Sequence, residues 1–217
     1  VFSYNNSKNI VIDNWDFPSL FIDPAGKTSL TVSSMTTSTF TNNNFSGGFT
    51  HGIRLNGNNT SNVFDINNFA NATSWALYFA GGSNQQNTIT NNDFNSASYA
   101  LSYNYGTPAE ISGNDFRNTI QGVQIYSADG FSLTAPGQTG TNSNTWGNHR
   151  DVVFQYNNSK NIVIDNWDFS SLFINPAGKT ALTVSGMTTS TFSNNNFSGG
   201  FTHALRINGN NSSNTFN

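Results

Sequence analysis

Carboxylates are the side chains on which sugar-cleaving chemistry depends, and the sequence holds eleven of them. Enzymes of that kind bring two carboxylates together for acid and base roles, or gather carboxylates around calcium. The acids of this chain are Asp13, Asp16, Asp23, Asp65, Asp93, Glu110, Asp115, Asp129, Asp151, Asp165 and Asp168. They are spread along the whole sequence without a dense cluster of lysine or arginine. We therefore assign no catalytic residue, no cofactor-binding residue and no metal ligand.

One position in the sequence carries several of these acids. Asp16, Asp93 and Asp115 each stand directly before a phenylalanine, where Asn44 and Asn68 stand in similar segments. Alternation of Asp and Asn at one position is typical of a polar turn, which is the interpretation we adopt. If the segments stack, Asp93 and Asp115 lie on neighbouring turns and could hold a cation between them.

His51 and Arg54 form the pair most like a functional site, because they recur later in the chain as His203 and Arg206. A spacing of three along a strand places two side chains on opposite faces. This spacing predicts no joint role, and we interpret both residues as solvated surface side chains.

The composition excludes several classes of function. Only 9% of the residues are charged, the net charge is −3, and there are eight Lys and Arg together. Nucleic-acid binding needs a basic face, which this composition does not supply. The absence of cysteine excludes disulfides and thiolate metal sites. No apolar run reaches the roughly 18–20 residues of a membrane-spanning helix.

A long repeat organises the chain. Residues 1–65 recur as residues 153–217 at a constant offset of 152, with 53 of 65 positions identical. Tandem copies this similar are typical of repetitive architectures, in which each unit extends its neighbour. We interpret 1–152 as one full unit and 153–217 as the start of the next. The chain begins at Val1 inside a repeat, so we expect it to be a segment of a longer protein.

A shorter motif recurs within the long unit: an apolar residue, then Asn or Asp, then Phe five places after the first residue. Its instances are Ile12–Phe17, Phe40–Phe45, Phe64–Phe69, Ile89–Phe94, Ile111–Phe116, Ile164–Phe169 and Phe192–Phe197. We place a degenerate copy at Trp146, with Asp151 at its phenylalanine position. Six steps of unequal length then make one long unit, with a mean of about 25 residues per step.

Segments that alternate apolar and polar residues lie between the motifs, as in Gly52–Leu55 and Gly122–Tyr126. Alternation is the strand period, and no amphipathic helix is evident. Short strands at this regular spacing predict an all-β fold, a right-handed parallel β-helix (solenoid) with one motif per turn. We expect residues 1–217 to form one continuous solenoid, with Phe stacked on Phe and with ladders of hydrogen-bonded Asn.

Two segments do not fit the regular period. The longest step, from Ile111 to Trp146, contains residues 127–140, which we expect to form a loop thrown out from the solenoid, where function tends to reside. Residues 23–27 and their copy at 175–179 predict a second bulge.

The motif resembles the repeats of the NosD-like group in the pectate-lyase-like superfamily. The most similar segments are Asn62–Phe69 and Asn87–Phe94, and strands such as Gly52–Leu55 and Gly122–Ile125 match the second strand of those repeats. The resemblance implies a right-handed parallel β-helix. It implies little about chemistry, since the superfamily includes lyases, glycosidases, epimerases, periplasmic proteins and surface proteins.

These observations favour a structural role over catalysis. We expect an extracellular or cell-surface β-solenoid, a segment of a repetitive fibre, sheath or giant adhesin that self-associates head-to-tail or laterally, with no enzymatic activity. The alternatives are a polysaccharide lyase or epimerase, and a glycan-binding module with a polysaccharide partner. The few basic residues disfavour an acidic polysaccharide. A Thr-rich stretch at 35–39 suggests ice or glycan binding, but it occurs once per long unit and forms no regular array.

Overall fold

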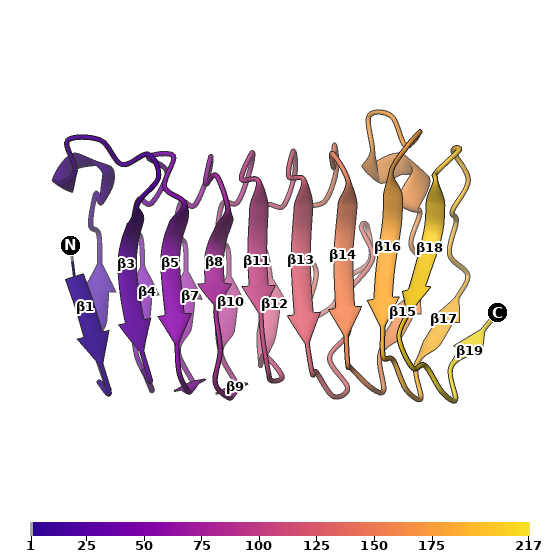
Figure 1. Cartoon of the computed structure of the whole chain (residues 1–217), viewed down its shortest axis with the longest axis horizontal. Coiled ribbons are helices and arrows are strands. Elements are labelled where there is room, and N and C mark those ends of the chain that lie inside the picture. The colour runs from indigo at the N-terminus through magenta and orange to yellow at the C-terminus, as the bar shows by residue number, and fades with distance from the viewer. Residues whose placement is uncertain (1) are drawn as a thin grey trace.

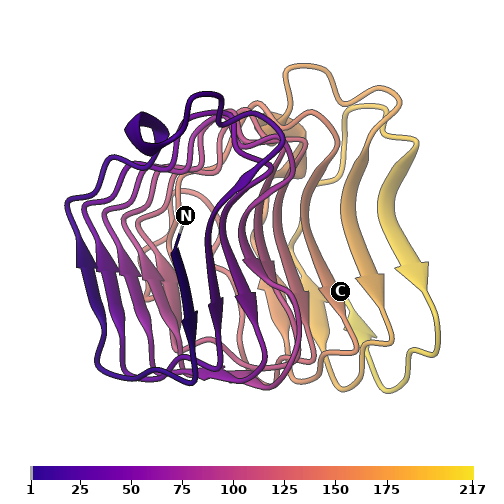
Figure 2. The ribbon, with the colours of Figure 1, turned by 60° about the vertical axis from the view of Figure 1, so that its left-hand side comes forward.

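The computed structural model describes residues 2–217 as a single coil of parallel strands (Figures 1 and 2). Strands on the near side of Figure 1 run downward, strands on the far side run upward, and the chain advances from left to right. Together these directions define a right-handed solenoid, as the sequence predicted. The only helical segments in the described residues are two short 3₁₀ turns, η1 (Pro18–Leu20) and η2 (Phe169–Leu172).

Two walls of strands face each other across the core. The near sheet consists of β1 (Phe2–Asn5), β3 (Thr28–Ser33), β5 (His51–Asn56), β8 (Trp75–Phe79), β11 (Tyr99–Tyr103), β13 (Gln121–Tyr126), β14 (Val152–Asn157), β16 (Thr180–Ser185) and β18 (His203–Asn208), in that order. The far wall consists of β2 (Val11–Asp13), β4 (Thr39–Thr41), β7 (Val63–Asp65), β10 (Thr88–Thr90) and β12 (Glu110–Ser112), and then of β15 (Val163–Asp165), β17 (Thr191–Ser193) and β19 (Thr215–Phe216). A separate two-stranded sheet is formed by β6 (Asn59–Thr60) and β9 (Asn84–Gln85).

Each internal strand of the near sheet pairs with the strands one turn before and one turn after it. Leu30 pairs with Ile53, Ile53 with Leu77, and Leu77 with Leu101. The solenoid has about 24 residues per turn, which confirms the predicted architecture and a period close to the predicted one. β14 pairs with both β13 and β16, so the sheet continues without a gap through residue 152.

The phenylalanine of each motif points into the core and stacks on its counterpart in the next turn. Phe17, Phe45, Phe69, Phe94 and Phe116 are all fully buried. Their ring centroids are 4.5–5.2 Å apart along the series, and the rings are nearly parallel. Burial of one such side chain stabilises the fold by about 1.5–3 kcal/mol. The motif is thus a packing rule, repeated once per turn.

An asparagine ladder runs beside the phenylalanines and is formed by Asn43, Asn67, Asn92, Asn114 and Asn144. The Nδ2 of each of the first four members donates to the Oδ1 of the next member at 3.0 Å. The same Oδ1 accepts the backbone N–H of the member before it. Buried amides are costly unless they are paired, and here each turn satisfies the previous one. The predicted ladder is confirmed.

The predicted register is wrong at the longest step. The motif analysis placed Trp146 at the first position and Asp151 at the phenylalanine position. In the structure Thr145 pairs with Asp115, and the Trp146 ring lies 4.8 Å from the ring of Phe116, so Trp146 fills the phenylalanine position. The long step is therefore shorter, and the step after it longer, than the motif analysis predicted. Both ends of the motif point inward and accept an aromatic ring, so spacing alone did not distinguish them.

The segment 127–140 is only partly a loop. Phe131, Leu133 and Ala135 are buried, and the Tyr156 hydroxyl donates to the Phe131 carbonyl and accepts the Leu133 N–H, both at 3.1 Å. The long exposed run begins only at residue 136 and extends to 141. Alternate apolar residues draw the middle of the segment into the core, which the prediction of a projecting loop did not foresee. The bulges at 23–27 and 175–179 do project, beside η1 and η2 (Figure 1).

Candidate functional site

The acidic residues do not converge on a site. Asp93 and Asp115 lie on neighbouring turns, as expected. However, the Asp115 carboxylate forms an ion pair with Arg117, with Nη2 and Oδ2 2.7 Å apart. Burial acts to raise the pKa of Asp115, but the hydrogen bonds and charge of Arg117 outweigh it and lower the pKa. No group of three His, Cys, Asp or Glu side chains within residues 2–217 is arranged to hold a metal ion.

His51 and Arg54 share one face, which corrects the prediction from their spacing. The His51 ring lies 5.2 Å from the Tyr78 ring, and the Arg54 guanidinium carbon lies 5.7 Å from the centre of the same ring. Two consecutive residues between them, Gly52 and Ile53, are both buried, so strict alternation fails at this point. His51 therefore lies on the outer face together with Arg54, against the same Tyr78 ring.

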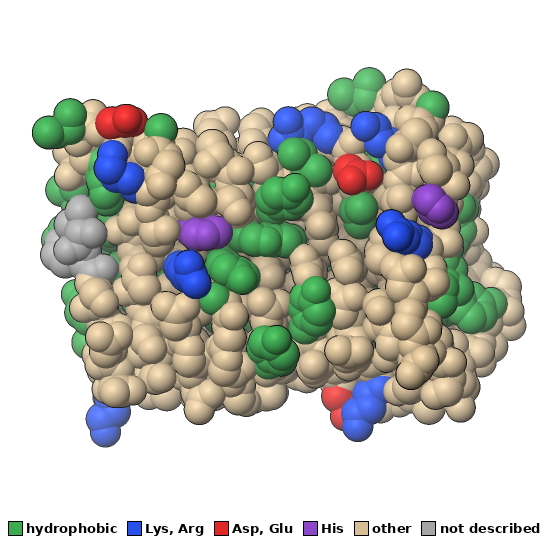
Figure 3. Space-filling view, viewed as in Figure 1, with side chains coloured by type: hydrophobic (Ala, Val, Ile, Leu, Met, Phe, Trp, Pro, Cys, Tyr) green, Lys and Arg blue, Asp and Glu red, His purple; other side chains and the backbone are tan. Residues whose placement is uncertain are grey.

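The outer face of the near sheet is built from columns of side chains, one residue from each turn. One column follows Thr31, Arg54, Tyr78, Ser102, Gln124, Gln155, Thr183 and Arg206. The adjacent column contains Trp75, Tyr99, Gln121 and Val152, and His51 Nδ1 lies 2.8 Å from the Trp75 carbonyl oxygen. Aromatic residues of the two columns therefore lie together over the middle turns, with Trp75 and Tyr78 on one turn and Tyr99 on the next. Figure 3 shows hydrophobic side chains gathered over the middle of this face.

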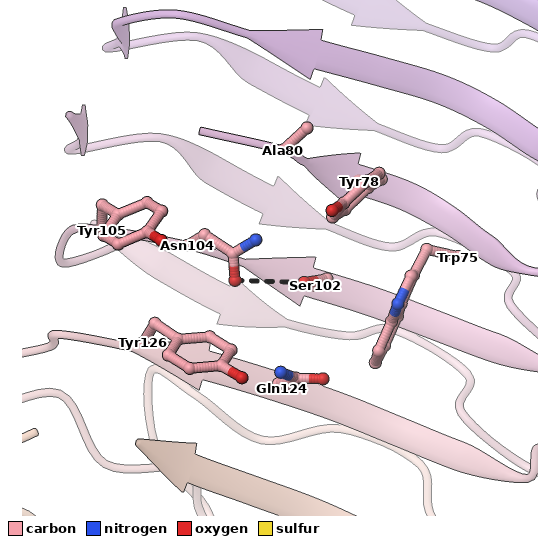
Figure 4. A pocket seen from close by; sticks show the side chains of 8 residues that line it. All are labelled: Trp75, Tyr78, Ala80, Ser102, Asn104, Tyr105, Gln124 and Tyr126. Carbon is pink, nitrogen blue, oxygen red and sulfur yellow. Dashed lines mark hydrogen bonds between the residues drawn. The ribbon is translucent and has the colours of Figure 1, made fainter. Parts of the chain in front are cut away.

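A hollow of about 250 Å³ opens on the outer face toward the C-terminal ends of β8, β11 and β13. Ser102 and Asn104 are buried and form its floor, joined by a hydrogen bond of 3.2 Å from Ser102 Oγ to Asn104 Oδ1 (Figure 4). The hollow exists because Ser102 is short and lies between the longer Tyr78 and Gln124 in the column.

Aromatic rings surround this floor. Trp75 and Tyr78 stand on β8, and Tyr105 and Tyr126 stand on the opposite side (Figure 4). The Tyr105 and Tyr126 rings are 6.5 Å apart and stacked, and Tyr105 is 57% exposed. Beyond the hollow, Trp75 packs against Tyr99 at 5.1 Å. The rings thus continue from turn to turn along the solenoid axis.

The hollow is polar but carries no charge. Its lining consists of Trp75, Tyr78, Ala80, Ser102, Asn104, Tyr105, Gln124 and Tyr126. The sequence analysis missed this site because each aromatic fits the alternating strand pattern, and the columns become visible only when the turns are in register. The sequence signal that could have indicated this site is the presence of aromatic residues at outward-facing positions of successive strands.

The comparisons with known proteins find similarity of architecture only. No protein-family model and no curated protein matches the chain. The full-length structure of QnrB1, a plasmid-mediated fluoroquinolone resistance protein, aligns with 14% identity and a TM-score of 0.39, over 95% of this chain and 93% of that chain. A trypsin-treated variant of QnrB1 aligns with the same identity and TM-score, over 95% of this chain and 91% of that chain.

HetL, a pentapeptide repeat protein from the cyanobacterium Nostoc sp. strain PCC 7120, aligns with 9% identity and a TM-score of 0.28, over 91% of this chain and 89% of that chain. Neither of these neighbours is described as a NosD-like or pectate-lyase-like protein, so the resemblance of the motif to those repeats stays a prediction. The strand pairing of the chain itself shows a parallel β-solenoid of about nine turns. Within the described residues, no helix has the length and apolarity to cross a membrane.

Proposed function

We propose that the chain is a structural segment of a long, extracellular β-solenoid, in which the 152-residue repeat lengthens one continuous object. The observation that carries the proposal is the pairing of β14 with both β13 and β16, which crosses the boundary between copies in register. Near-identical copies and a weakly charged polar surface also support it. A fibre, a sheath or an adhesin stalk would use such a segment as a rigid spacer.

The test measures length against the number of repeat units. Arrays of one, two and three copies of residues 1–152, each followed by residues 153–217, are compared by small-angle scattering and electron microscopy. Six turns at the strand spacing predict about 29 Å of added length per copy. A matched array with a Gly/Ser linker at each boundary provides the flexible reference. Arrays that bend like this reference would show separate domains and overturn the proposal.

Self-association is the second part of the proposal. In a longer array the next turn pairs with β18, as β8 pairs with β5. Association between whole arrays is therefore tested on the three-copy array, for which we expect concentration-dependent assembly in sedimentation velocity. A sedimentation coefficient that does not change with concentration would contradict self-association.

The proposal includes the absence of catalysis, and the alternative is a lyase or epimerase acting on an acidic polysaccharide. Its test is incubation of the purified chain with a panel of uronic-acid polymers. An increase in the absorbance of unsaturated products would establish β-elimination and overturn the structural assignment.

A further inference from the structure

The hollow between β8, β11 and β13 has the features of a binding site and no evident role in stability. Its rim residue Tyr105 is 57% exposed, and its ring stacks on Tyr126 at the edge of the hollow. The positive φ of Tyr105 (59°) belongs to the turn itself, since the equivalent residues Ser34 and Ser127 have similar values. Exposed aromatic patches with polar surroundings commonly mark interaction sites.

Two amides at the hollow are available to a ligand. Asn104 Nδ2 and the Gln124 side chain make no hydrogen bond within residues 2–217, whereas Asn104 Oδ1 accepts from Ser102. The internal bond fixes the orientation of the Asn104 amide, so its NH₂ group is presented as a donor. Gln124 supplies both a donor and an acceptor. A few placed polar groups among aromatic rings are the usual composition of a small-molecule site.

The lining of the hollow carries no charge, which disfavours charged ligands. None of the eight lining residues is acidic or basic. Arg54, which precedes Tyr78 in the column, lies over the Tyr78 ring and donates from Nε to Asn56 Oδ1 at 3.3 Å. A carboxylated or sulfated ligand would therefore meet no counter-charge within the hollow. The strands here are internal to the sheet, so a peptide could not bind by adding a strand.

From these features we propose that the hollow binds a neutral glycan, with a pyranose ring over the floor and its neighbouring sugars along the solenoid axis. Sugar rings present apolar C–H faces to aromatic rings and hydroxyl groups to amides. Trp75, Tyr105 and Tyr126 provide the faces, and Asn104 and Gln124 provide the hydrogen bonds. A cavity of about 250 Å³ suits one sugar ring at a time, and the rings of Trp75 and Tyr99 extend the platform.

The test uses neutral hexasaccharides as probes: β-1,4-linked glucose, β-1,3-linked glucose and β-1,4-linked xylose. Calorimetry gives the affinity, and tryptophan fluorescence reports on Trp75, with Trp75→Phe identifying its share of the signal. A hexamer of galacturonic acid and a proline-rich peptide are the comparison ligands. We expect at least one neutral hexasaccharide to bind and to change Trp75 emission.

Two variants locate the binding. Ser102→Tyr fills the hollow with a side chain that the same column already carries at Tyr78, and Gln124→Ala removes the unpaired amide. Each is expected to weaken binding by about tenfold or more. Gln155→Ala, one turn further along the same column, is the matched control and should leave the affinity within about twofold. Circular dichroism checks that all variants retain the fold.

Three results would overturn the proposal. The first is that no neutral hexasaccharide binds at concentrations up to about 10 mM. The second is that binding persists in both Ser102→Tyr and Gln124→Ala, which would place the ligand elsewhere. The third is that the acidic hexamer or the proline-rich peptide binds the hollow more tightly than every neutral glycan.

Discussion

Trp15 and Trp167 occupy equivalent positions in the two copies of the long repeat, yet Trp15 is 42% exposed and Trp167 is 1% exposed. The Trp167 ring lies 5.5 Å from the Trp146 ring and 4.7 Å from the Phe154 ring. The turn that contains Trp146 precedes Trp167, and no described turn precedes Trp15. Identical local sequence therefore gives different burial, because in a solenoid the neighbouring turn completes each site.

This pair offers a test with an internal control. Trp167→Ala should lower the free energy of unfolding by about 3–5 kcal/mol, since it removes a large buried ring. Trp15→Ala in the same chain should cost less, about 2 kcal/mol, since 42% of the residue is already in water. Urea unfolding followed by circular dichroism measures both. Similar losses for the two variants would show that the turns do not stack as described.

The asparagine ladder should depend strongly on each member. Asn67 accepts from the backbone N–H and from Nδ2 of Asn43, and it donates to the Phe40 carbonyl and to Asn92 Oδ1. Asn67→Ala leaves several of these buried groups without partners, at about 1–3 kcal/mol each. The expected loss in the free energy of unfolding is about 3 kcal/mol or more.

The adjacent residue provides the control for this ladder variant. Asn68 is only partly buried, and its Oδ1 accepts the backbone N–H of Ala70. Asn68→Ala should cost about 1 kcal/mol. If Asn67→Ala were no more damaging than Asn68→Ala in the same unfolding assay, the ladder would contribute no more than an ordinary turn.

His149 should make the fold sensitive to acid. Burial lowers the pKa of His149 to about 3, whereas an unfolded histidine titrates near 6.5. Below pH 6.5 the unfolded chain binds a proton that the folded chain does not bind. Stability is therefore full above pH 6.5 and falls by about 1.4 kcal/mol per pH unit as the pH decreases toward 3. The free energy of unfolding, measured by urea denaturation at pH 7, 6 and 5, gives this slope.

Removal of the imidazole should flatten the pH dependence. In His149→Leu, Thr119 Oγ1 loses the contact with His149 Nδ1 at 2.9 Å but keeps its bond to the Phe116 carbonyl at 3.0 Å. Burial also lowers the pKa of His51, so a shallower slope should remain. His203→Gln, at an exposed histidine, is the control. An unchanged slope in His149→Leu would mean that other groups govern the acid response.

Ile66 is a site where a substitution should stabilise the protein. It adopts a left-handed backbone conformation (φ 53°), which is unfavourable for a β-branched residue, and it is 53% exposed. The equivalent residues of the neighbouring turns, Asn42 and Asn91, have the same φ and tolerate it well. Ile66→Asn should raise the free energy of unfolding by about 1 kcal/mol. Asn91→Ile, the reverse change one turn away, should lower it by at least as much, since Asn91 Nδ2 also donates to Asp65 Oδ1 at 2.9 Å. Effects of the same sign would contradict the argument.

The sequence alone was sufficient for the period, the inward phenylalanines and the asparagine ladder. Each turn must bury the same positions and pair the same amides, so these constraints recur at a readable spacing. The pattern failed where two positions accept the same residue type, as at Trp146, and where two consecutive buried residues break alternation, as between His51 and Arg54. The prediction that 127–140 forms a projecting loop was wrong in part, because alternate apolar residues of this segment, Phe131, Leu133 and Ala135, are buried in the core.

Only the tertiary structure decided which residues become neighbours on the outside of the solenoid. Ser102 is one full turn of the chain from Tyr78 and another from Gln124, and nothing within any one segment marks the three as adjacent. Turns of unequal length shift the register by several positions, so a column of side chains exists only after the strands have paired. Core positions are fixed by burial, which the sequence records in every turn. The outer face carries no such constraint, and its hollow arises from a short side chain between two long ones.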